Sequence, residues 1–150
     1  MLPKMHILSG AIFSLIIWAI FPATHWAYII LLFIGSFMMD FDHYMCAVYK
    51  TGKISLLNAL EYYRKWVIQK KEEAKRGVFK KGHFHIFHTI EFHILFLILS
   101  FMWVPFAYVF VGMIFHSILD FIWLAYEKRL YIREYFLTRW LWQKLQNSHR

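Results

Sequence analysis

Cysteine, proline and glycine are scarce in this sequence, and two long stretches of it lack positive charge altogether. Among 150 residues there are six glycines, three prolines and one cysteine, Cys46. A lone cysteine cannot form an internal disulfide, so the sequence gives no sign of an oxidising compartment. No Gly/Ser-rich linker or low-complexity tract divides a chain of this length. We therefore expect a single domain over residues 1–150.

Apolar residues are abundant instead. They make up 60% of the chain, and aromatic residues make up 21%, whereas soluble domains are roughly 45–50% apolar. The excess lies in four segments that, with their flanks, approach the roughly 20 residues needed to cross a bilayer. Pro22 and Pro105 mark tight turns between them. The sequence predicts an all-α integral membrane domain of four short transmembrane helices, paired as two hairpins. Their expected ranges are about 3–21, 24–43, 85–103 and 105–126.

The basic residues are confined to one side of this predicted bundle. All 17 Lys and Arg residues lie at position 4, within 50–81 or within 128–150. Under the positive-inside rule, the termini and the central loop face the cytoplasm from the cell (inner) membrane. Orientation and contact with anionic phospholipids explain the net charge of +8, so no nucleic-acid partner is expected. A signal peptide is an alternative for the first segment, although no small-residue cleavage motif follows it.

Two further segments combine apolar and basic residues at helical spacing. In residues 54–76, Leu56, Leu60 and Tyr63 recur on one helix face, and residues 130–146 alternate tryptophans with arginines. We expect both to be amphipathic helices in the headgroup region on the cytoplasmic side. Surface helices packed on the protein itself are an equal alternative.

Histidines and carboxylates gather in the cytoplasmic half of the predicted helices. They are His6, Asp40, Asp42, His43, His83, His85, His88, Glu91, His116 and Asp120. The opposite side has only His25. A charged side chain near the bilayer centre costs about 2.5–3.5 kcal/mol on insertion scales, so these groups need partners. A divalent metal would serve several of them at once.

Spacing within the helices favours such a metal. His116 and Asp120 lie four residues apart and share a helix face, and His88 and Glu91 do so at three apart. Imidazole mixed with carboxylate suits zinc, with manganese or iron as alternatives. A metal-free hydrogen bond between His116 and Asp120 is the simpler alternative for that pair.

Asp40 and His43 also share a face if the second helix continues that far. Asp42 would then point elsewhere, and it would serve a second metal, act as a base or lie where the helix has ended. His85 and His93 are more often packing histidines than ligands in such positions. His6, His43 and His83 also have a simple interpretation, as polar groups facing lipid headgroups.

Four short motifs, taken in order, resemble those of a known family. They are HILSG at 6–10, DFDH at 40–43, HFHIFHT at 83–89 and HSILD at 116–120. They are similar to His-x-x-x-Gly, Pro-Asp-x-Asp-His, His-Arg-x-x-Thr-His-Ser and His-x-x-x-Asp of the YdjM-like membrane-bound metal-dependent hydrolases. The resemblance implies site residues at His6, Asp40, Asp42, His43, His88, His116 and Asp120, with His83 as the first histidine of the third motif.

The chain departs from the family pattern at four positions. Met39 stands where the family has proline, Phe84 replaces arginine, Phe87 replaces threonine and Thr89 replaces serine. The arginine matters most, because a guanidinium is the natural group to hold a substrate anion. We expect His85 or a loop lysine to take its place.

A fainter similarity to zinc-dependent phospholipases C and P1-type nucleases adds phosphoester hydrolysis as the expected chemistry. One to three ions would be held by His6, Asp40, Asp42, His43, His88, Glu91, His116 and Asp120. Asp40 or Asp42 would accept the proton of a metal-activated water, and His83 or His85 would stabilise charge.

Because the site is expected at headgroup depth, a lipid or lipid-linked phosphoester is the expected substrate. A divalent-metal carrier or sensor and a non-enzymatic membrane adaptor are the alternatives. One-sided placement of the polar groups argues against transport, since an alternating-access path needs polar groups in both halves.

Overall fold

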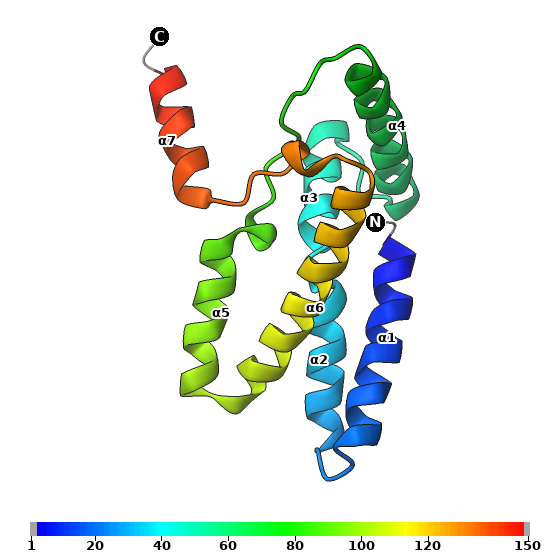
Figure 1. The fold of residues 1–150 in the computed structure, drawn as a ribbon, viewed down its shortest axis with the longest axis vertical. Coiled ribbons are helices and arrows are strands. Elements are labelled where there is room, and N and C mark those ends of the chain that lie inside the picture. Colours follow the sequence, from blue (N-terminus) through cyan, green and yellow to red (C-terminus); the bar gives the residue numbers. More distant parts are fainter. Residues whose placement is uncertain (1–2, 149–150) are drawn as a thin grey trace.

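The computed structural model describes residues 3–148, and its regular structure in that range is entirely helical (Figure 1). The elements are α1 (Pro3–Ile20), α2 (Trp26–Met38), α3 (Phe41–Thr51), α4 (Leu56–Lys75), the 3₁₀ turn η1 (Ile86–His88), α5 (Ile90–Met102), α6 (Val104–Tyr126), the 3₁₀ turn η2 (Leu130–Ile132) and α7 (Leu137–Ser148). The expected all-α fold is confirmed.

The pairing of α2 with α6 is the most extensive helix contact in the molecule, and α1 packs on α2 while α5 packs on α6. Glycines permit the α2–α6 pairing. A Cβ added to Gly35 would collide with the backbone carbonyl of Val109, and one added to Gly112 would collide with that of Leu32. Small residues that let backbones approach closely are typical of helix packing in membranes. These two glycines fix how α6 lies against α2.

Two stretches are long and apolar enough to cross a membrane: Trp26–Thr51, which is α2 continued by α3, and α6. The other two apolar helices, α1 and α5, are shorter. Their outer faces expose large side chains; Leu15 is 61% exposed and Ile98 54%. Contiguous apolar surface of this kind is unfavourable in water and suits lipid. Membrane residence is supported, whereas four full crossings stay a prediction.

The helix ends near the polar residues differ from the expected ranges. The predicted helix at 24–43 divides at Met39 and Asp40, so that α3 begins at Phe41. The predicted helix at 85–103 begins only at Ile90, because Thr89 is extended (φ −85°, ψ 152°) and accepts a hydrogen bond from Phe92 N at its N-cap. The shared face expected for His88 and Glu91 is therefore wrong, since the two residues do not belong to one helix.

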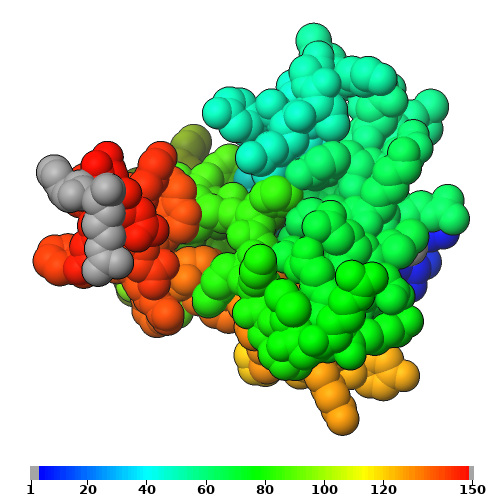
Figure 2. Space-filling view, turned by 90° about the horizontal axis from the view of Figure 1, so that it is seen from above, coloured from blue at the N-terminus to red at the C-terminus, as the bar shows by residue number. Residues whose placement is uncertain are grey.

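Both amphipathic segments contain helices, although the second is interrupted. α4 covers most of 54–76, whereas η2 and an irregular stretch precede α7 in the tail. The start of α1 and the end of α7 lie at the same end of the bundle as α3 and α4, and the α1–α2 and α5–α6 turns lie at the other (Figure 1). Figure 2 looks onto the first end, where chain coloured cyan to green, from α3 to η1, covers much of the surface and α7 lies at one side. The polar site lies beneath this cover.

Candidate metal centre

The structure brings together histidines and aspartates that are far apart in the sequence. Four overlapping groups of three residues each place one nitrogen or oxygen per residue within 4.8 Å of the others. They are His6/Asp40/His116, Asp40/His43/His88, Asp42/His43/His85 and His88/His116/Asp120. Such buried groups could hold a metal ion. The sequence reasoning named all eight residues as ligand or catalytic candidates.

His88, His116 and Asp120 form the most deeply buried group. The two Nε2 atoms lie 3.3 Å apart, and each lies 3.7 Å from Asp120 Oδ2. Two imidazole nitrogens bound tetrahedrally to zinc at about 2.0–2.1 Å would be separated by about 3.3 Å. The edge between the two nitrogens therefore matches that of a zinc coordination tetrahedron, whereas the two edges to the carboxylate oxygen are longer, at 3.7 Å.

The Nδ1 atoms of His88 and His116 make hydrogen bonds on the side of each ring away from the other histidine. These bonds determine the tautomer, and therefore whether each Nε2 atom carries a lone pair. His116 Nδ1 donates to the carbonyl of Ser36 at 2.9 Å, because a carbonyl oxygen can only accept. His88 Nδ1 donates to Asp42 Oδ2 at 3.2 Å. In the neutral rings both Nε2 atoms then carry lone pairs and face each other without a proton between them. A metal cation removes this repulsion, as does a proton held between the two nitrogens.

Asp42 holds His88 in that orientation. Its Oδ2 also accepts from Phe87 N at 3.0 Å, and its Oδ1 lies 3.4 Å from His85 Nδ1. A carboxylate behind a metal-facing histidine fixes the tautomer and raises the basicity of the ring. The second helix ends at Met38, so the condition of the spacing argument is not met, yet Asp40 and Asp42 still fall into different groups of donors.

His6 and Asp40 complete the wall around His116. His6 Nε2 donates to Asp120 Oδ1 at 3.0 Å, its ring stacks on that of His116 at 4.0 Å, and Asp40 Oδ1 lies 3.9 Å from His116 Nε2. His6 Nδ1 and Asp40 Oδ2 are buried without a hydrogen-bond partner. Buried polar atoms are rarely left so, and a metal or its bound water would satisfy them.

His43 and His85 lie at the side of the clustered donors that is nearer α4. Their ring centres are 3.8 Å apart, and Tyr63 meets His43 edge-on at 5.1 Å. His43 Nδ1 is buried without a hydrogen-bond partner. Together with Asp42, these residues offer a separate set of donors for a metal.

Glu91 lies outside the four groups, although it was expected as a ligand. Its carboxylate accepts hydrogen bonds from Leu137 N at 2.9 Å and from the N and Oγ1 of Thr138 at 3.0 and 2.9 Å. It therefore caps the N-terminus of α7 from the first turn of α5.

Two more histidines also lie outside the groups. His83, expected to stabilise charge, hydrogen-bonds Tyr62 at 2.7 Å, and burial lowers its pKa, with the neighbouring His85 adding to the effect. His93 contacts the carbonyl of Thr89 and Ser117 Oγ, each at 2.8 Å. Both therefore have protein partners away from the clustered donors.

Sequence reasoning missed Arg133, the guanidinium that does reach the site. Its Nη2 lies 2.7 Å from Asp120 Oδ2. Phe84, at the position of the family arginine, instead stacks on Trp140 at 4.2 Å. One feature of the sequence indicated that Arg133 could lie near the site: the chain after α6 starts at the end of the bundle where the site lies (Figure 1). His85 or a loop lysine was expected to replace the family arginine, and Arg133, from the tail, is a further positively charged group beside Asp120.

Comparison with protein families matches residues 1–131 to the family described as YdjM inner membrane protein. No curated protein and no solved structure matches the chain. The matched range covers most of the sequence and contains all four motifs and all eight clustered residues, while Arg133 lies just beyond it. The chain belongs to the YdjM inner membrane protein family.

Proposed function

We propose that this protein is a membrane-bound, metal-dependent hydrolase that cleaves a phosphoester of a lipid or lipid-linked substrate at the cytoplasmic face. The observation that carries the proposal is the pair of Nε2 atoms of His88 and His116, 3.3 Å apart beside the Asp120 carboxylate. Three donors at ligand spacing, two with fixed tautomers, favour metal binding over a metal-free polar core.

Zinc is the ion that this donor set suits best, with manganese or iron as alternatives. His88, His116 and Asp120 would hold it, with His6 and Asp40 beside them. A bound divalent ion of this kind lowers the pKa of water to about 7 and neutralises phosphoryl charge. Asp40 Oδ2, buried and without a partner, is the carboxylate oxygen best placed to accept the water's proton.

The residues around the first group have separate tasks in this proposal. Asp42 orients His88 through its Nδ1, so we assign it a positioning role. His43 and His85, with Asp42, would hold a second ion, which fits the two-metal arrangement common in phosphoester hydrolysis. Arg133, ion-paired to Asp120, supplies positive charge where an anionic substrate would arrive.

Location motivates the choice of a lipid-linked substrate. The apolar helices α1, α2, α5 and α6 are proposed to cross the membrane with the α3–α4 end in the cytoplasm. All Lys and Arg residues of 3–148 belong to segments at that end, which supports this orientation. α5 alone spans about 20 Å, so it needs its flanks or a locally thinned bilayer to cross. The polar cluster would then lie at headgroup depth.

The test uses protein purified in detergent and in nanodiscs, with metal content measured by elemental analysis. We expect bound zinc and hydrolysis of phospholipids or of a generic phosphodiester, and we expect both to be lost in His116→Ala and in Asp120→Asn. His25→Asn is the control, because His25 caps α2 at the opposite end and asparagine also caps helices. Metal-loaded protein without hydrolysis would overturn the proposal.

Two other outcomes would identify the alternatives. Zinc uptake into proteoliposomes would support a carrier. A preparation that binds no metal at all would support an adaptor without enzymatic function. The described polar groups cluster at one end of the bundle, which favours the hydrolase over the carrier.

A further inference from the structure

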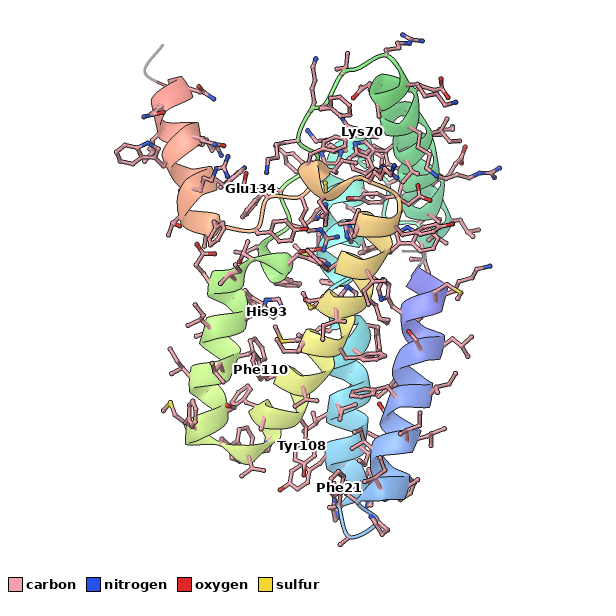
Figure 3. All side chains as sticks on the ribbon, viewed as in Figure 1. Phe21, Lys70, His93, Tyr108, Phe110 and Glu134 are labelled. Carbon is pink, nitrogen blue, oxygen red and sulfur yellow. The ribbon has the colours of Figure 1, made fainter. Side chains whose placement is uncertain are left out.

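A groove of about 320 Å³ lies between α5 and α6 and runs up to the metal centre. Ile94 and Leu97 of α5 form one apolar wall, and Phe110, Ile114 and Phe121 of α6 form the other. From Phe110 to Phe121 the α6 wall rises by about 16 Å. Figure 3 shows His93 and Phe110 between the two helices. The groove is therefore long and apolar for most of its length.

One end of the groove is polar and reaches the metal centre itself. His88, Arg133 and Tyr135 line that end. Arg133 also contacts Asp120 at 2.7 Å, and His88 Nε2 faces His116. His88 thus belongs both to the groove and to the clustered donors, and Arg133 joins the groove to Asp120, another of these donors.

The arginine is held there by backbone contacts of its own segment. Ile90 N donates to Tyr135 O at 2.9 Å, and Glu91 receives the backbone N–H groups of Leu137 and Thr138. This ties the chain after η2 across the start of α5. Arg133 therefore occupies a fixed position at the top of the groove.

Access to the groove is from the side of the bundle. The end of the molecule above the site is covered by the chain from α3 to η1 (Figure 2), whereas Ile94 is 49% exposed and Phe121 54% exposed along the flank. In a membrane this flank faces lipid. A molecule already in the bilayer can enter there without leaving the apolar phase.

We propose that the α5–α6 groove binds one acyl chain of an anionic phospholipid, with Arg133 on its phosphate beside the metal centre. Charge and polarity match along the whole length, because a cation closes one end of an otherwise apolar groove. Arginine is well suited to phosphate, since its planar guanidinium offers several donors in a fixed geometry. This inference rests on the proposed function for the fate of that phosphate, but binding can be measured separately.

The first experiment maps the occupant. Metal-loaded protein in nanodiscs is photolabelled with a phosphatidic acid that carries a diazirine in one acyl chain, and the labelled peptides are identified by mass spectrometry. We expect label on α5 and α6 within residues 90–124. Leu97→Trp and Ile114→Trp fill the groove and should lower labelling at least about fivefold, which corresponds to roughly 1 kcal/mol.

Matched controls distinguish the groove from the rest of the lipid-facing surface. Ile98→Trp, next to Leu97 on α5, and Ile118→Trp, four residues after Ile114 on α6, are the controls. Both positions are somewhat more exposed than the two test positions, and neither lines the groove. They should label as the unmodified protein does. Equal labelling in all four tryptophan variants would mean general lipid contact and would overturn the proposal.

The second experiment tests the phosphate contact. Arg133→Gln should weaken binding of phosphatidic acid about tenfold or more, as expected for a charge-assisted contact, and should leave labelling by a neutral diacylglycerol probe unchanged. Glycerol 3-phosphate, which has the headgroup without chains, should not compete at equal concentration. Competition by it, or no effect of Arg133→Gln, would contradict the assignment.

Failure of the groove and failure of the hydrolase give different results. If the protein cleaves a generic phosphodiester but the groove is not labelled, the proposed acyl-chain site is rejected and the proposed hydrolase activity is retained. If the groove is labelled in a way that depends on Arg133 but no phosphoester is hydrolysed, the proposed binding site is retained and the proposed hydrolase activity is rejected.

Discussion

The Nε2 atoms of His88 and His116 face each other across 3.3 Å, although 28 positions separate the two residues in the chain. Each ring is oriented from behind, His88 by the Asp42 carboxylate and His116 by the Ser36 carbonyl. Both lone pairs therefore point to one place, and this relationship makes metal binding the property to measure first.

Asp42 lies behind His88 and is not a member of the His88/His116/Asp120 group. Removing its carboxylate should nevertheless weaken metal binding to that group. We expect Asp42→Asn to lower zinc affinity about tenfold, and Asp42→Ala up to about a hundredfold, because the ring loses its fixed tautomer. Competitive chelator titration measures the change. Glu61→Gln, which alters only an exposed pair with Lys65, is the control. An unchanged affinity in Asp42→Ala would show that Asp42 does not position His88.

Close packing of α2 on α6 should limit what residue 112 can be. Gly112→Leu places a side chain against the Leu32 carbonyl, so the helices must separate, at a cost of about 1–3 kcal/mol or more. We expect a lower unfolding temperature and less bound metal, since α6 carries His116 and Asp120. Val111→Leu, at an exposed neighbouring position, should leave both unchanged. A Gly112→Leu protein as stable as Val111→Leu would contradict the close approach.

The capping role of Glu91 separates it from the metal ligands. Glu91→Ala should cost about 1 kcal/mol locally, because three hydrogen bonds to the start of α7 are lost. We expect faster proteolysis between residues 133 and 148, followed by mass spectrometry, with zinc content retained. Loss of zinc with normal proteolysis would instead make Glu91 a ligand.

Side-specific labelling should test the proposed orientation. In a Cys46→Ala background, we expect Ser148→Cys to react with a membrane-impermeant maleimide only in inverted inner-membrane vesicles. Ala23→Cys, in the α1–α2 turn at the opposite end, should react only in vesicles of the native orientation. Both introduced positions are exposed. The reverse pattern would place the polar site on the outer face.

Much of the site could be predicted from residue type and chain position. The lengths of the apolar segments predicted the helices. Histidine and aspartate are confined to one half of each predicted helix, which predicted the depth in the membrane at which they meet. Eight candidates named on that ground do fall into the four groups. The i, i+4 pair of His116 and Asp120 lies within one helix, so its shared face was fixed by helix geometry alone.

Contacts between distant segments could not be predicted in this way. The sequence determined an all-helical, apolar chain with its polar residues at one end, because periodicity and charge act locally and a bilayer sorts residues by depth. Only the tertiary structure decided that Thr89 ends the shared face of His88 and Glu91, that Glu91 caps α7, and that Arg133 reaches Asp120. Those outcomes depend on how the tail packs across α5, and nothing in its local sequence specifies that contact.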